Sequence, residues 1–246
     1  MTEISDYFQK CIIGDCVEVT SHLPTESIDL IITTAAMGDE YSYSNYVLED
    51  EEGISSKWDF PKLAREMYRI LKPGGVLCWN VGELIINDCE SNVPAKHLLF
   101  FREIGFRCHA TIIINKKRLR LRKEVYPTSF EYVYCLSKGQ PRVFNRQHFS
   151  KIWEGPSRME EDLVMGLARQ QRTGELQHIN TLHPAKTQIW LINDLMLTYS
   201  NVDDVILDPF LGSGTVLQVA KKLNRNGIGI EVNEKYAGLY LEDSWI

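Results

Sequence analysis

A segment near the end of the chain has the residue types of a nucleotide-sized cofactor site. The stretch from Asp208 to Thr215 follows the apolar run 205–207, which predicts a buried strand, and precedes a predicted helix over 215–223. Its glycines allow the backbone to turn tightly beside a ligand. Glu231 ends the next strand about 20 residues after Gly212, a spacing that places a carboxylate near the ribose of a bound adenosine. The expected cofactor contacts are Asp208, Phe210, Gly212, Ser213, Gly214, Thr215 and Glu231.

The identity of the cofactor follows from what the segment lacks. A dinucleotide-binding turn needs a third glycine three positions after Gly214, and that position is Leu217. A phosphate-binding loop needs a lysine after Gly214, and none is present. Asp208 would also repel a pyrophosphate. An adenosine with a cationic, amine-bearing tail fits better, so we expect S-adenosylmethionine, and a nicotinamide-dependent oxidoreductase is the disfavoured alternative.

The remainder of the sheet must come from upstream, because the roughly 40 residues after position 203 are too few for a doubly wound fold. Short apolar runs alternate there with helical patterns, which indicates βαβ units and a doubly wound parallel α/β sheet. The predicted strands cover 11–13, 28–33, 76–81, 110–115 and 131–136, and the predicted helices cover 60–71 and 188–199, the second of them amphipathic.

Several short motifs follow one another in a specific order. They are Gly14-Asp15, a strand ending in a tetrapeptide at Thr34, Leu71 to Gly75, Phe130 to Val133, His183 to Lys186, and Asp208 to Thr215 with Glu231. This order resembles the circularly permuted amino-group DNA methyltransferases, which make N4-methylcytosine or N6-methyladenine, over about residues 10 to 240. The resemblance implies a Rossmann-like methyltransferase fold with a catalytic half (1–138), a small target-recognition insert (139–182) and a cofactor half (183–246).

The catalytic tetrapeptide departs from the family pattern. The family has Asp, Asn or Ser, then Pro-Pro, then Tyr or Phe, whereas this chain has Thr34, Ala35, Ala36 and Met37. The amino nitrogen of a base is a poor nucleophile, so the site must accept its N–H bonds with a side-chain oxygen and a backbone carbonyl. Thr34 and the Ala35 carbonyl retain these acceptors, while the rigidity of proline and the stacking face of an aromatic are lost.

Two explanations of the altered tetrapeptide remain open. In one, the chain is a natural member with a relaxed site, in which Tyr41 or Tyr43 stacks on the flipped base. In the other, alanines at positions 35 and 36 have replaced the two prolines and disable the site. The second explanation predicts an inert protein that binds S-adenosylmethionine and nucleic acid without turnover.

The resemblance also implies roles for single residues. Asp15 would contact the adenine side of the cofactor, and Lys186 would serve its carboxylate. The hydroxyl of Thr34 favours N4 of cytosine over N6 of adenine as the target, because a hydroxyl residue is commoner in the cytosine class. An RNA methyltransferase is an alternative, because a flipped RNA base offers the same amino group.

One local cluster of cations stands out in a chain whose net charge is −6. It lies on a predicted loop between the strands 110–115 and 131–136, and a phosphate-tracking arm is favoured over a solvated hairpin. The expected DNA-binding residues are Lys116, Lys117, Arg118, Arg120, Arg122 and Lys123.

Arginines and glutamines, Arg142 among them, accumulate between Gly139 and Leu182, where a helix is predicted over 159–172. These side chains suit reading of base edges in the major groove. Double-stranded DNA is therefore the expected partner. The short insert implies a short recognition site or help from a second subunit, so a homodimer is a further expected partner, and a cognate restriction nuclease is another.

Composition is typical of a cytoplasmic enzyme. The six cysteines form no Cys-x-x-Cys pair and are expected to be buried thiols. No metal site is expected, because the histidines lack ligand spacing. The N-terminal sequence has no signal-peptide pattern, and no apolar run is long enough to span a membrane.

Overall fold

The computed structural model describes residues 3–34, 46–49, 55–83, 85–86, 89–115, 130–146, 189–234 and 236. Seven strands form the main sheet: β1 (Lys10–Ile13), β2 (Ile28–Thr34), β5 (Leu71–Gly82), β8 (Arg107–Asn115), β9 (Phe130–Ser137), β10 (Val205–Asp208) and β11 (Asn226–Glu231). The helices are η1 (Ile4–Tyr7), α1 (Cys16–His22), α2 (Phe60–Ile70), α3 (Val93–Glu103), α5 (Ile189–Tyr199) and α6 (Thr215–Lys222). Two small hairpins pair β3 (Tyr46–Glu49) with β4 (Ser55–Trp58), and β6 (Ile85–Ile86) with β7 (Cys89–Glu90).

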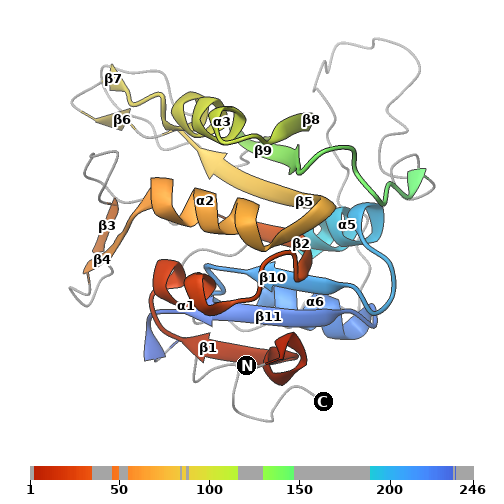
Figure 1. The fold of residues 1–246 in the computed structure, drawn as a ribbon. Helices are drawn as coiled ribbons and strands as arrows, with labels where there is room; N and C mark the ends of the chain where they lie inside the picture. Colours follow the sequence, from red (N-terminus) through yellow and green to blue (C-terminus); the bar gives the residue numbers. More distant parts are fainter. Residues whose placement is uncertain are drawn as a thin grey trace.

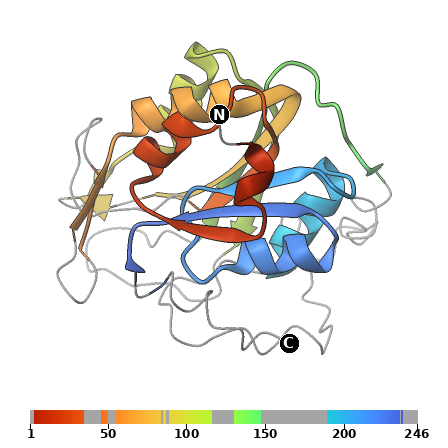
Figure 2. The same ribbon diagram turned by 60° about the horizontal axis from the view of Figure 1, so that its bottom comes forward.

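The main sheet has the strand order β1-β11-β10-β2-β5-β9-β8. The first five strands are parallel, and β9 is antiparallel to both β5 and β8. In Figure 2, β1 (red) lies beside β11 (blue), although the two strands come from opposite ends of the chain. We call the edge at which the parallel strands end the carboxyl edge, and the opposite edge the amino edge.

Helices cover both faces of the sheet (Figure 1). Leu77 and Trp79 of β5 pack in the cluster with α1, α2 and α3, whereas Val76 and Cys78 pack in the cluster with α5 and α6. Both faces of the central strands are therefore buried, which is why these strands read as continuous apolar runs in the sequence. The predicted doubly wound α/β fold is confirmed.

Local sequence explains how α2 forms and which face it buries. Asp59 caps the helix by accepting a hydrogen bond from the backbone N–H of Lys62 at 3.1 Å. Its buried residues recur at helical spacing and form one apolar stripe against the sheet: Phe60, Leu63, Ala64, Met67 and Ile70. The helix predicted over 188–199 is α5, and it is buried over most of its circumference instead of along one stripe.

Two glycines of β11 allow α6 to approach the sheet closely. A Cβ atom at Gly227 would lie 2.5 Å from a methyl carbon of Leu217, and one at Gly229 would lie 2.6 Å from a methyl carbon of Leu211. Leu217 stands where a dinucleotide-binding turn would have its third glycine. Its side chain occupies the space beside Gly227 of the next strand. This packing sets the distance between α6 and the end of β11.

The connections leave β10 and β2 in opposite directions. From β10 the chain runs through α6 to β11, and from β2 it runs through α2 to β5 on the other side. In open α/β sheets ligands bind outside the carboxyl ends of strands at such a switch point. The carboxyl edge at β10 and β2 is therefore the expected position of the site.

The first residues of the predicted recognition insert lie on the surface and hydrogen-bond to the main sheet and to α5. The Arg142 guanidinium donates to the carboxylate of Asp29, and also to Asp204 Oδ1 at 3.2 Å. Both aspartates lie at the amino edge. Asn145 donates to the carbonyl of Leu197 at 2.9 Å. The guanidinium of Arg142 is thus engaged at the edge opposite the catalytic strand end, and the recognition role of the segment 139–182 stays a prediction. The helix predicted over 159–172 lies outside the described residues.

Candidate cofactor and catalytic site

Asp208 ends β10 and is buried at the carboxyl edge. Its Oδ1 atom accepts a hydrogen bond from the Thr33 hydroxyl at 2.7 Å and another from the backbone N–H of Phe210 at 3.0 Å. Burial raises the pKa of Asp208 to about 7, and these two hydrogen bonds oppose that shift. The carboxyl group thus joins the ends of β10 and β2 across the switch point.

The loop after Asp208 turns into α6 through glycine conformations. Gly212 and Gly214 have φ values of 51° and 78°, in the left-handed region that favours glycine. Gly214 occupies the N-cap position of α6, and its N–H donates to the carbonyl of Leu211 at 3.0 Å. The Ser213 and Thr215 hydroxyls lie 3.0 Å apart. The predicted cofactor segment is therefore a tight turn that presents small polar groups beside Asp208.

Glu231 ends β11 and is tied to this turn. Its Oε2 atom accepts from the N–H of Gly212 at 2.8 Å, and its Oε1 atom accepts from the N–H of Asn233 at 2.9 Å. Each carboxylate oxygen has a second lone pair, so both oxygens can also accept from hydroxyl groups of a ligand. The structure brings the predicted ribose partner to the predicted cofactor turn.

Asp15 lies on the neighbouring strand end. The N–H of Gly14 donates to the carbonyl of Glu231 at 3.0 Å, which holds the end of β1 against the end of β11. The Asp15 carboxylate caps α1, because its Oδ1 atom accepts from the N–H groups of Val17 and Glu18 at 2.8 and 3.0 Å. Asp15 therefore has a clear role in the fold, and its contact with adenine stays a prediction.

Thr34 ends β2 directly opposite Asn80 of β5. The Nδ2 atom of Asn80 donates to the Thr34 hydroxyl oxygen at 3.4 Å. Thr34 is the one member of the predicted catalytic tetrapeptide within the described residues, and Ala35, Ala36 and Met37 lie outside them. Lys186 lies outside them as well.

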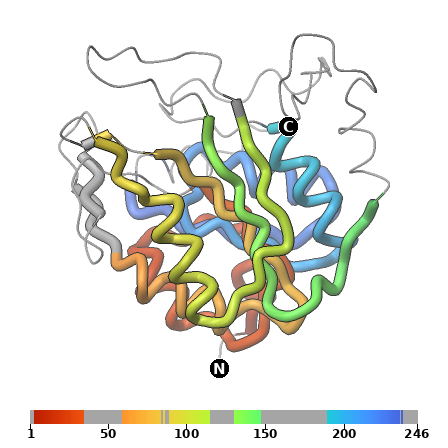
Figure 3. The backbone as a smooth tube through the Cα atoms, turned by 90° about the horizontal axis from the view of Figure 1, so that it is seen from above, coloured from red at the N-terminus to blue at the C-terminus, as the bar shows by residue number. Residues whose placement is uncertain are grey.

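The basic cluster from Lys116 to Lys123 also lies outside the described residues. The described residues that flank the cluster are Asn115 at the end of β8 and Phe130 at the start of β9. They are register partners of the two paired strands, which lie side by side in Figure 3. Because β9 is antiparallel to both β5 and β8, these two residues lie at the carboxyl edge. The segment that carries the cations is therefore connected to the edge where Thr34 and Asp208 end their strands.

Two residues of the site were not predicted from the sequence. Thr33 binds Asp208, and Asn80 binds Thr34. Both are polar residues near the end of an otherwise apolar buried strand, and this pattern was the available signal. Which partner each would meet depended on the register between strands.

Other reactive groups supply no competing site in the described part of the chain. No group of three or more His, Cys, Asp or Glu residues that could hold a metal ion is found there. All six cysteines are free, but the expectation of buried thiols holds for only three of them, since Cys11 and Cys108 are partly buried and Cys89 is exposed. Burial raises the pKa of Cys11 to about 11 and that of Cys16 to about 12. These two thiols are therefore protonated at neutral pH. Among the described helices, none has the length and apolar character needed to cross a membrane.

Comparisons with known proteins identify the family. The family model for N6/N4 methyltransferases, described as DNA methylase, matches residues 28–242. The orphan methyltransferase M.BamHII of Bacillus amyloliquefaciens is 28% identical, over 92% of this chain and 88% of that protein. The type II methyltransferase M.BglII of Bacillus subtilis is 24% identical, over 95% of this chain and 68% of that protein.

Solved structures agree on the fold. The PvuII DNA methyltransferase, described as cytosine-N4-specific, aligns with a TM-score of 0.68 at 20% identity, over 96% of this chain and 87% of that chain. The M1.HpyAVI–SAM complex aligns with a TM-score of 0.60 at 20% identity, over 95% and 98% of the two chains. The predicted methyltransferase fold, family and enzyme class are confirmed, and S-adenosylmethionine is confirmed as the cofactor at the level of the family. The chain belongs to the N6/N4 DNA methylase family.

Proposed function

We propose that the chain transfers a methyl group from S-adenosylmethionine to the exocyclic amino group of a base flipped out of double-stranded DNA. The observation that carries this proposal is the hydrogen bond between Thr33 and Asp208. It fixes the end of the cofactor strand β10 beside the end of the catalytic strand β2. A methyl donor bound at Asp208 and an amino group bound at Thr34 would then be neighbours.

The chemistry of the carboxyl edge fits a cationic cofactor. Asp208 and Glu231 place two carboxyl groups beside one glycine turn, and neither group has an ion pair with a described cation. Burial of Asp208 without a cation raises its pKa, and a positive ligand would favour its ionised form. A pyrophosphate would meet repulsion here. S-adenosylmethionine, with its sulfonium and ammonium groups, has the matching charge.

The proposed cofactor contacts follow from this arrangement. Glu231 would accept from the ribose hydroxyls, and Asp15 would lie on the adenine side. The turn from Phe210 to Thr215 would enclose the middle of the cofactor, and Lys186 would bind its carboxylate. When bound, the cofactor supplies an electrophilic methyl group.

The reaction would be a direct displacement without a covalent enzyme intermediate: the N–CH3 bond would form as the S–CH3 bond breaks, S-adenosylhomocysteine would leave, and one proton of the amino group would be released to solvent. Thr34 would accept an N–H bond of the amino group through its hydroxyl oxygen, and the carbonyl of Ala35 would accept the other. This holds the nitrogen lone pair toward the methyl group. Met37 replaces the aromatic that stacks on the base in the family, and Tyr41 or Tyr43 would take over that contact.

N4 of cytosine is favoured over N6 of adenine, on the ground of the hydroxyl residue at position 34. The cations from Lys116 to Lys123 would track DNA phosphates. A homodimer is a further proposed partner. A cognate restriction nuclease is another: the name of M.BglII, a type II methyltransferase, favours one, and the name of M.BamHII, an orphan methyltransferase, does not. A DNA substrate would place the protein in the cytoplasm.

An inert binder of cofactor and DNA is the second candidate, and the observation that favours it is the pair Ala35 and Ala36. The test is to incubate the protein with S-adenosylmethionine and unmethylated DNA, and to quantify N4-methylcytosine and N6-methyladenine by mass spectrometry after digestion. One modified nucleoside supports the enzyme and identifies the base. Cofactor binding without either product supports the inert protein or an RNA substrate. Prolines at positions 35 and 36 would then raise turnover if the alanines are the defect.

A further inference from the structure

Asn80 has an unusual combination of burial, position and hydrogen bonding. Asn80 is buried, with 7% of its surface exposed, and it lies near the end of β5 at the carboxyl edge. Its Nδ2 atom donates to Thr34, whereas its Oδ1 atom is buried and has no hydrogen-bond partner. A buried amide oxygen without a partner is unfavourable, so native structures retain one mainly where it serves another purpose.

The other buried polar atoms without partners in the described part of the chain lie elsewhere. They belong to Gln9 before β1, to Asp194 and Thr198 within α5, and to Gln218 within α6. None of these residues hydrogen-bonds to Thr34, the one described residue of the predicted tetrapeptide. Asn80 alone among them contacts Thr34.

The direction of the strands places the two side chains on one face of the sheet. Thr34 and Asn80 are register partners, and the residue two positions before each, Ile32 and Cys78, packs in the cluster with α5 and α6. Side chains two positions apart on a strand lie on the same face. The Thr34 hydroxyl and the Asn80 amide therefore lie together on that face, at the edge where a flipped base would enter.

Methyl transfer to an amino group requires acceptors for its N–H bonds. A main-chain carbonyl restrained by prolines would supply one of these acceptors, but alanines occupy positions 35 and 36 and lack the φ restraint of proline. The Oδ1 atom of Asn80 is an acceptor on a rigid strand, which can hold a reacting group more precisely than a loop.

We propose that Asn80 is a substrate-contacting residue whose Oδ1 atom accepts an N–H bond of the target amino group, while its Nδ2 atom orients the Thr34 hydroxyl. The inference rests on the proposed function and changes one contact of it: the second N–H bond of the amino group goes to Asn80 Oδ1 in place of the Ala35 carbonyl. The Asn80 amide and the Thr34 hydroxyl hold the amino nitrogen between them, and no bond to the protein forms or breaks.

The test compares single-turnover methylation of unmethylated DNA by the wild type and by Asn80→Leu, which keeps side-chain volume and removes both polar atoms. The rate is expected to fall at least 30-fold, with S-adenosylmethionine affinity within twofold of the wild type. Asn80→Asp keeps an acceptor oxygen and is expected to retain at least tenfold more of the rate than Asn80→Leu. Asn145→Ala, which removes hydrogen bonds at the amino edge, is the control and is expected to leave the rate within twofold.

A second readout, which a purely structural role would not change, is the affinity for a DNA duplex that carries the target site in unmethylated form. The site is first mapped from the wild-type product. Replacing the target amino group by hydrogen should weaken binding to the wild type at least fivefold, and should weaken binding to Asn80→Leu by less than twofold. The proposal is overturned by an Asn80→Leu rate within threefold of the wild type, by equal losses in the Leu and Asp variants, or by equal sensitivity to the missing amino group. Absence of product with the wild type would overturn the proposed function itself, and Asn80's role with it.

Discussion

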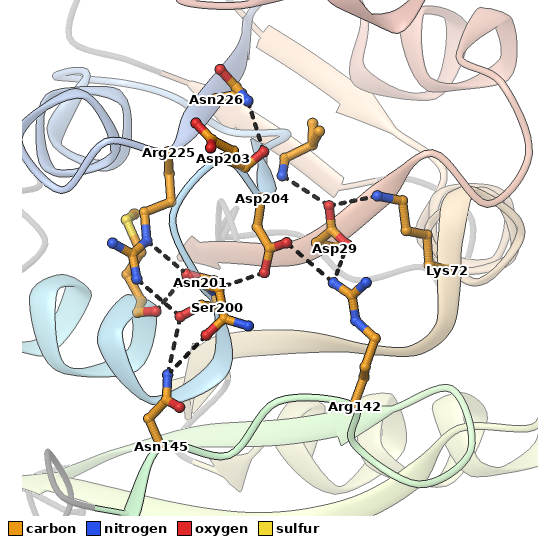
Figure 4. A network of polar contacts seen from close by, with 12 residues as sticks. Asp29, Lys72, Arg142, Asn145, Ser200, Asn201, Asp203, Asp204, Arg225 and Asn226 are labelled. Atoms are coloured by element: carbon orange, nitrogen blue, oxygen red, sulfur yellow. Dashed lines mark hydrogen bonds and ion pairs between the residues drawn. The ribbon is translucent and has the colours of Figure 1, made fainter.

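The two edges of the parallel sheet hold one buried aspartate each, and the two side chains have different surroundings. Asp29 at the amino edge accepts from Lys72 at 2.7 Å, from Arg142, and from the N–H of Val205 at 2.9 Å (Figure 4). Asp208 at the carboxyl edge accepts from a hydroxyl and one backbone N–H, and from no described cation. One buried carboxylate is neutralised by cations of the protein, and the other, which has no described cation beside it, is the one that we propose meets the cationic cofactor.

The contacts at the amino edge hold the fold together, whereas the carboxyl edge is where we propose that the cofactor binds. At the amino edge the network continues through Asp204, Asn201, Ser200 and Arg225, and it fixes the start of β10 against β2 and the segment after β9 (Figure 4). At the carboxyl edge the pKa of Asp208 is raised by burial. Carboxyl groups with strongly shifted pKa values that lie at a switch point are typical of functional sites.

The largest expected effect is on stability, at the amino edge. Asp29→Ala leaves the N–H of Val205 and two cations without their shared acceptor. The Lys72 and Arg142 side chains are 33% and 49% exposed and can be solvated, so the main cost is the unsatisfied buried N–H of Val205, about 1–3 kcal/mol of the free energy of unfolding. Urea unfolding measures this loss, and the folded variant should bind S-adenosylmethionine with unchanged affinity. A loss below about 1 kcal/mol would show that the edge is not held by Asp29.

The next effect is on cofactor affinity, at the carboxyl edge. Asp208→Asn keeps the shape of the side chain and removes its charge, so S-adenosylmethionine should bind about 10- to 100-fold more weakly at pH 8, which corresponds to about 1.4–2.8 kcal/mol. In the wild type the affinity should rise as pH increases through about 7, because the ionised form of Asp208 then predominates. Calorimetric titrations at pH 6 and pH 8 measure both effects. A wild-type affinity independent of pH would count against a cation at this position.

A third buried carboxyl, Asp194 of α5, sharpens the comparison because it lies in an apolar cluster. Burial raises its pKa to about 7, so the folded protein binds a proton that the unfolded chain has released above about pH 4. Stability therefore falls as pH rises toward and through 7, by about 1.4 kcal/mol between pH 6 and pH 8 for this group. Asp194→Asn should remove that part of the pH dependence, and Asp208→Asn should remove a similar part.

Unfolding of both variants across this pH range separates the two carboxyl groups. If Asp194→Asn leaves the full pH dependence in place, then its carboxyl is not the group that titrates. The cofactor affinity of this variant serves as the control, since α5 should influence it by less than twofold.

The smallest expected effect concerns Arg142. Its side chain is 49% exposed, and Lys72 still pairs with Asp29 when the arginine is removed. Arg142→Ala should cost less than about 1 kcal/mol. The affinity for DNA and its dependence on salt should not change, because the residue lies at the amino edge. A smaller salt slope would instead return Arg142 to the DNA-binding surface.

Much of the fold could be predicted from the sequence, and so could the contact between the glycine turn and Glu231. Continuous apolar runs identified the buried strands, and the spacing of the glycine turn and Glu231 predicted that the two meet, as they do; their role in cofactor binding stays a prediction. Helix boundaries were close to the observed ones, as for the predicted helix over 60–71 and the observed α2, Phe60–Ile70.

The remaining site residues could not be predicted because they depend on contacts distant in sequence. Thr33 meets Asp208, and Asn80 meets Thr34, only through the order and register of β10, β2 and β5. Arg142 looked like a member of the recognition insert by composition. The return of the chain after β9 brings it instead to Asp29, a partner 113 positions away.

The most direct test of the account is hydrogen–deuterium exchange with and without S-adenosylmethionine. The account predicts that saturating cofactor slows exchange in peptides covering 208–215 and 226–233 at the carboxyl edge, and leaves peptides covering 139–146 and 200–204 at the amino edge unchanged. Protection confined to the amino-edge peptides, or no protection at either edge under saturating cofactor, would contradict it.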